Sequence, residues 1–230
     1  MTQSLDLLDN IVWHTLAGTH AHLAVGTDQV RRYAAGYSPL IGARATDAPD
    51  LVALGEFCRP GEQFYLSGWT GDVPTGWRLD VDASMEQYVR LDPAVPEGAP
   101  DARRLGREHV PQALALVKRT LPGPFAERTI ELGEFYGLFD GDQLVAMTGE
   151  RMHAGALREV SAVCTHPDYQ GRGLARRVMN EVIRRQLARG EVPFLHVMSA
   201  NSAARRLYEM MGFRRHQTLS VRAVTFVGRG

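Results

Sequence analysis

Residues 159–175 read E-V-S-A-V-C-T-H-P-D-Y-Q-G-R-G-L-A. Small and β-branched residues at its start predict a strand over Leu157–Thr165, and the proline in His166–Tyr169 predicts a turn. Apolar residues then recur at helical spacing from Leu174 to Arg189, and Gly190 is placed to end that helix. The segment therefore predicts a strand, a glycine-rich turn and a long helix.

The glycine-rich turn is the candidate binding element. The first turn of a helix leaves several backbone N–H groups without partners, and the helix dipole adds positive charge there. Gly171 and Gly173 have no side chains to block an approaching phosphate, and Arg172, Arg176 and Arg177 add positive charge. Neither the P-loop pattern nor the dinucleotide pattern G-x-G-x-x-G fits this turn. A seat for phosphate is predicted, with a tight helix start as the alternative.

The turn closely resembles the cofactor loop of the GNAT N-acetyltransferase superfamily. That loop reads Q/R-x-x-G-x-G/A and stands here as Gln170-Gly171-Arg172-Gly173-Leu174-Ala175. The family's later motif also stands here, as Asn201-Ser202-Ala203-Ala204, Leu207-Tyr208-Glu209 and Gly212-Phe213. The resemblance is tight over residues 159–213 and looser back to residue 103. It implies an α/β (α+β) fold with a mixed, mostly antiparallel sheet flanked by helices, and an enzyme that takes acetyl-CoA as co-substrate.

The resemblance also implies roles for single residues. The backbone of Val163, Cys164 and Thr165 would pair with the pantetheine arm, and the side chain of Asn201 would contact it. The turn residues Gln170, Gly171, Arg172, Gly173, Leu174 and Ala175 would hold the pyrophosphate. Tyr208 would lie near the sulfur and protonate the departing thiolate. Plain core packing for Tyr208 and a helix-start role for Asn201 remain open.

The attacking amine must lose a proton, because an alkylamine with a pKa near 10 is mostly charged at neutral pH. Glu159 is the first candidate for the general base, since it precedes Gln170 by the same offset as the base of the histone-acetylating branch. Glu150 is the second candidate. The alternative for Glu159 is a solvated or ion-paired strand residue, since many members of the family use solvent or backbone instead.

A proline-rich stretch, Asp92–Asp101, reads as a linker between an N-terminal α/β region, 1–95, and a GNAT domain, 96–230. The resemblance says little about residues 1–95, which would be a degenerate second copy of the fold or a substrate cap. Patterns there predict a helix over Asp47–Cys58, capped by Asp47, and strands over 62–69, 77–81 and 85–91. Beyond the linker they predict helices over 109–119 and 202–211, a hairpin of 135–139 and 143–153 around Asp140-Gly141-Asp142, and strands over 193–198 and 219–227.

Composition limits the classes of function. A formal net charge of zero argues against a protein built to bind nucleic acid or an anionic membrane. Residues 1–150 hold 12 basic against 21 acidic residues, and residues 151–230 hold 14 against 5. This asymmetry either favours a cationic acceptor or reflects halves whose charges pair with each other.

The remaining composition predicts a soluble, cytoplasmic protein without a metal. The two cysteines, Cys58 and Cys164, are far apart, and no signal peptide or membrane-length apolar run occurs. His14, His20 and His22 have no Cys, Asp or Glu at ligand spacing beside them.

We therefore predict direct transfer of acetyl to an amine of a small molecule, a peptide or a lysine, without an acyl-enzyme. A homodimer is left open. The alternatives are a non-catalytic acyl-CoA-binding module and, from the basic half, a nucleic-acid-binding protein whose affinity falls steeply with salt.

Overall fold

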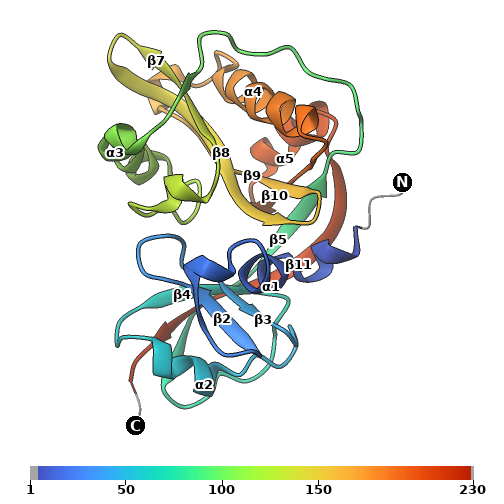
Figure 1. Ribbon diagram of the computed structural model, residues 1–230. Helices are drawn as coiled ribbons and strands as arrows, with labels where there is room; N and C mark the ends of the chain where they lie inside the picture. The colour runs from blue at the N-terminus through green and yellow to red at the C-terminus, as the bar shows by residue number, and fades with distance from the viewer. Residues whose placement is uncertain (1–4, 229–230) are drawn as a thin grey trace.

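The computed structural model describes residues 5–228 and is built on one eight-stranded sheet (Figure 1). The strand order is β4-β11-β5-β10-β9-β8-β7-β6. The strands are β4 (Gln63–Ser67), β5 (Trp77–Val89), β6 (Arg103–Arg104), β7 (Phe135–Asp140), β8 (Gln143–Ala154), β9 (Leu157–Thr165), β10 (Val192–Met198) and β11 (Arg214–Phe226). All neighbours are antiparallel except β9 and β10. The mixed, mostly antiparallel sheet is confirmed.

The three longest helices cover both faces of the sheet. Helix α3 (Val110–Thr120) packs against β8 and β9 on one face, around a core that contains Phe135 and Met147. Helices α4 (Leu174–Ala188) and α5 (Ser202–Met210) lie together on the other face, as Figure 1 shows. Their core contains the α4 stripe residues Val178 and Val182. No helix within residues 5–228 is long and apolar enough to cross a membrane.

The N-terminal part forms the lower body in Figure 1 and holds elements that the sequence did not indicate. These are α1 (Ile11–Ala17) and a three-stranded antiparallel sheet of β1 (Ala24–Gly26), β2 (Val30–Tyr33) and β3 (Ile41–Ala43). The helix predicted over 47–58 is shorter: α2 spans Leu51–Leu54 and continues as one 3-10 turn. The prediction of Asp47 as its cap is wrong, because the Asp50 carboxylate accepts the bond from the Ala53 amide, at 3.0 Å.

Strand β5 joins the two regions into one sheet. The two strands predicted over 77–81 and 85–91 are one continuous strand, which lies between β10 and β11. The stretch predicted as a linker is irregular and begins beside the buried Arg90, whose guanidinium donates to the carbonyls of Asp92 and Ala94, at 2.6 Å each. Residues 1–95 thus supply two strands of the main sheet, β4 and β5. The division at residue 95 and the role of residues 1–95 stay predictions.

The parallel strands β9 and β10 separate in the middle of the sheet. Their pairing runs from Leu157 opposite Val192 to Glu159 opposite Phe194 and goes no further. Beyond Glu159, strand β9 bulges: Ala162 has a φ of 53°, and Ala162 and Val163 together stand opposite one residue of β8. Residues 160–165, which we call the open edge of β9, therefore have no neighbouring strand on the β10 side within the described residues 5–228.

Ion pairs join the acidic first part of the chain to the basic last part. Arg177 holds Asp101 at 2.6 Å, and Arg222 holds Asp82 at 2.8 Å. Arg189 also pairs with Glu134, at 3.3 Å. These contacts support the interpretation that the charge asymmetry reflects halves that pair with each other.

Candidate cofactor and active site

The glycine-rich turn leaves a row of main-chain amides free at the start of α4. Gly171 and Gly173 have φ values of 75° and 73°, which favour glycine, and a Cβ added at either would meet nothing within 4 Å. Within residues 5–228, none of the amides from Gly171 to Ala175 donates a hydrogen bond, and no side chain caps the helix. An open cradle of free donors at a helix N-terminus fits a phosphate group.

The basic side chains around this turn have different surroundings. Arg172 donates to the carbonyl of Asp168 at 2.9 Å and stacks over the Tyr169 ring. Arg177 is paired with Asp101, whereas Arg176 is exposed and has no polar partner within residues 5–228. Gln170 is exposed, and its backbone N–H donates to the Pro167 carbonyl at 3.2 Å, which closes the preceding turn. Arg176 and the side chain of Gln170 are therefore the groups left available beside the cradle.

The open edge of β9 leads from this turn into the sheet. Val163 is half-buried and packs against the core under α4, whereas Cys164 is buried in the core under α3. Burial raises the pKa of the Cys164 thiol to about 12, so this side chain is not a nucleophile at neutral pH. The Thr165 hydroxyl is buried and has no hydrogen-bond partner in the described part of the chain. The backbone of this edge is open to an extended ligand.

Tyr208 lies on α5, behind the open edge. Its ring is 7% exposed and belongs to the same core as Val160 of β9 and Leu195 of β10. Its hydroxyl makes no hydrogen bond within residues 5–228, and burial raises its pKa to about 12. The phenol is therefore protonated at neutral pH, and its role as a proton donor stays a prediction.

Asn201 is the N-cap of α5. Its side-chain oxygen accepts a bond from the Ala204 amide at 3.1 Å, which supports the helix-start alternative. The side-chain NH₂ group keeps no partner within residues 5–228, so contact with a bound cofactor stays a prediction.

Glu159 is a buried ion-pair partner. Arg151 donates to both of its oxygens at 2.8 Å, and Nδ1 of His196 lies 2.9 Å from Oε1. Burial alone would raise the pKa of Glu159, but the charge of Arg151 and the bonds from Arg151 and His196 hold it at about 2. A carboxylate held this way is a poor proton acceptor near neutral pH. The structure therefore favours the ion-paired alternative over the general base.

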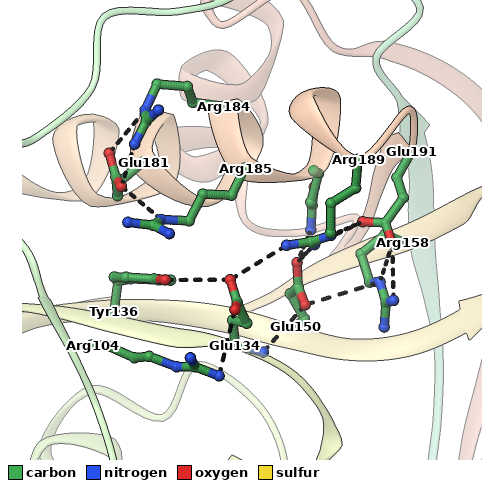
Figure 2. A network of polar contacts seen from close by, with 11 residues as sticks. Arg104, Glu134, Tyr136, Glu150, Arg158, Glu181, Arg184, Arg185, Arg189 and Glu191 are labelled. Atoms are coloured by element: carbon green, nitrogen blue, oxygen red, sulfur yellow. Dashed lines mark hydrogen bonds and ion pairs between the residues drawn. The ribbon is translucent and has the colours of Figure 1, made fainter.

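Glu150 is also held by cations, at the opposite end of α4 from the glycine turn (Figure 2). Glu150 is buried. Its Oε1 accepts a hydrogen bond from Arg189 and another from Nε2 of Gln186, the latter at 3.2 Å. Arg158 lies 3.9 Å from its other oxygen. Glu150 therefore belongs to a structural network, and the prediction of a catalytic role for it is not supported.

A polar row that sequence reasoning missed crosses the sheet at the point where β9 and β10 separate. The row contains Arg151, Glu159 and His196. Its next member is Gln87, whose Nε2 lies 3.0 Å from Nε2 of His196. Gln217 of β11 donates to Gln87 at 2.9 Å and also to Asp9 of the N-terminal part, at 3.5 Å. We call these five residues the polar row. The sequence gives no signal for it, because its members come from five different strands.

A strand that parts from its parallel neighbour beside a glycine-rich helix start agrees with the acetyltransferase fold that the resemblance in the sequence implied. The family model described as FR47-like protein matches residues 135–222. A crystal structure of a GNAT-family protein from Novosphingobium aromaticivorans is 36% identical, covers 95% of this chain and 98% of its own, and superposes with a TM-score of 0.85. The chain therefore belongs to the GNAT family.

Other relatives are more distant or cover less of the chain. A GCN5-related N-acetyltransferase-like protein from Streptococcus suis shares the fold, with a TM-score of 0.59 and 18% identity over 94% of this chain and 92% of its own. N-alpha-acetyltransferase RimI of Mycobacterium tuberculosis is 44% identical over 57 residues, which are 25% of this chain and 35% of that protein. Mycothiol acetyltransferase of Streptomyces scabiei is 28% identical over 151 residues, 59% of this chain and 49% of its own. The chain thus matches half or less of the length of these two enzymes.

Proposed function

We propose that this protein transfers an acetyl group from acetyl-CoA to a primary amine by direct attack within a ternary complex. The observation that carries the proposal is the row of free amides from Gly171 to Ala175, which opens onto the open edge of β9. The amides would bind the pyrophosphate, with Arg176 and Gln170 beside them. The backbone of Val163, Cys164 and Thr165 would pair with the pantetheine arm, which brings the thioester toward Tyr208.

In the reaction the neutral amine nitrogen attacks the thioester carbonyl carbon, and the carbon–sulfur bond breaks. The thiolate takes the proton of the Tyr208 phenol, because that hydroxyl is protonated and has no competing partner. A backbone N–H of the open edge would stabilise the developing oxyanion. Since Glu159 and Glu150 are both held in ion pairs, the ammonium proton would leave to solvent, from which the Tyr208 phenolate regains its own proton.

The acceptor would be an amine of a peptide or of a small molecule, as the names of the two matched enzymes suggest. A screen of amine acceptors with acetyl-CoA, followed by free thiol release, tests the proposal. Release that depends on both substrates supports an enzyme. CoA binding without any release would instead support the non-catalytic acyl-CoA-binding module.

The cradle can be tested with a matched pair of glycines at the two ends of α4. Gly173→Ala should weaken binding of CoA at least tenfold, because a methyl group enters the space in front of the amides. Gly190 at the other end has the same φ, 73°, and equally open space, so Gly190→Ala imposes the same backbone strain away from the cradle. Calorimetry should show unchanged CoA affinity for Gly190→Ala. Equal affinities for the two variants would contradict a phosphate seat at this turn.

A further inference from the structure

The sheet carries an apolar face beyond the polar row. Along β5, residues alternate sides, so Gln87 of the polar row is followed on its own side by Met85, Ala83 and Val81. Across the sheet, Met85 stands opposite Met198 of β10 and Leu219 of β11, and Ala83 stands opposite Val221. We call this set the Met85 face: Val81, Ala83, Met85, Met198, Leu219 and Val221.

The Met85 face packs against none of the molecule's hydrophobic cores. Each of the four core clusters in residues 5–228 excludes all six of its residues. Val81 and Met198 are each 44% exposed, and Ala83, Met85 and Leu219 are half-buried. Val221 is buried and forms the floor of the face. Single exposed apolar residues are normal, but a contiguous apolar patch on one face commonly marks a binding surface.

The position of the face relates it to the proposed site. Leu195 and Val197 of β10 point into the core that contains Tyr208, so His196 and Met198 point to the other side of the sheet. Met198 is the next residue after His196 on that side, and His196 contacts Glu159, the last residue that β9 pairs with β10. The Met85 face therefore begins four residues along β10 from Phe194, the last residue that pairs with β9, and lies on the side of the sheet opposite Tyr208.

We propose that the Met85 face binds the apolar body of the acceptor amine, an inference that rests on the proposed function. Tyr208 and the α4 turn engage the thioester and the phosphates from one side, which leaves the other side for the acceptor. All six side chains are uncharged, so they favour a hydrocarbon body rather than a second charged group. Met85 and Met198 are flexible and polarisable and can adapt to its shape.

A series of primary alkylamines from ethylamine to hexylamine tests this by turnover. The KM for the amine should fall with chain length, by up to about fourfold for each methylene that becomes fully buried. Met85→Gln and Met198→Gln should flatten this dependence and leave the KM for acetyl-CoA unchanged. Met210→Gln is the control, because Met210 is 79% exposed on α5 and lies outside the face. A dependence that stays equally steep in both face variants would overturn the inference.

Spectra of protein labelled at the methionine methyl groups give a readout that needs no turnover. Hexylamine added to the CoA complex should shift the signals of Met85 and Met198, assigned from Met→Leu variants, but not that of the buried Met179. Signals that change with protein concentration, and not with hexylamine, would show that a second copy covers the face and would overturn the inference. If acetyl-CoA and an amine together still release free thiol while the signals of Met85 and Met198 do not respond to the amine, the inference fails and the proposed function stands.

Discussion

Replacing Tyr208 with phenylalanine is expected to lower kcat about 100- to 1,000-fold while the Kd for acetyl-CoA changes little. The substitution removes only the hydroxyl, which has no hydrogen-bond partner within residues 5–228, so the ring and its contact with Phe213 remain. The departing thiolate then has no protein donor and must take its proton from water. Stopped assays of thiol release and calorimetry with acetyl-CoA measure the two quantities separately.

The control for Tyr208→Phe is another tyrosine that belongs to the same core. Tyr136 is buried there, but its hydroxyl donates to Glu134 at 3.2 Å, in the network of Figure 2. Tyr136→Phe should therefore change stability and leave kcat within about twofold. A Tyr208→Phe enzyme with the turnover of the native protein would assign Tyr208 to core packing, the alternative that its sequence context left open.

The elements that could be predicted from the sequence are those whose apolar pattern is long and bounded by turn residues. Strand β9 was predicted with both of its ends, and α4 to within one residue, because an amphipathic stripe and two glycines bound it. Strand β5 was split in two, because Asp82, Ala83 and Ser84, which lie between the two predicted strands, include no large apolar or aromatic residue. Strands β1, β2 and β3 have three or four residues each, too few for a periodicity to be visible.

For the site, the sequence indicated the local part and not the part made by strand pairing. The cradle depends on consecutive residues, so two glycines at a helix start were enough to indicate it. The environment of Glu159 depends on Arg151, which lies in an irregular stretch of the β8–β9 pairing, and on His196 of β10. Neither the register across such an irregularity nor the point where parallel strands part can be read from one sequence.

Removing one partner of the Arg151–Glu159 ion pair is expected to destabilise the fold strongly. Arg151→Met should lower the free energy of unfolding by about 3–5 kcal/mol, because it leaves the Glu159 carboxylate buried beside His196 alone. The double variant Arg151→Met, Glu159→Leu removes both charges and should recover much of this loss. Urea unfolding followed by circular dichroism measures the free energy of unfolding of all three proteins. A loss below about 1 kcal/mol for Arg151→Met would contradict this prediction, because a loss that small is typical of a solvent-exposed ion pair.

The pH dependence gives an independent test of the same pair. In the native protein the pKa of Glu159 is held at about 2, below its ordinary value of 4.5. Its contribution to stability is therefore complete above pH 4.5 and is lost as the pH falls from 4.5 toward 2. In Arg151→Met the dominant influence on Glu159 is burial, which raises its pKa, so lowering the pH neutralises the unpaired carboxylate. The difference in free energy of unfolding between the native protein and Arg151→Met should therefore shrink as the pH falls from 7 toward 4. A difference that stays constant over this range would mean that Arg151 stabilises the sheet by packing and not by its charge.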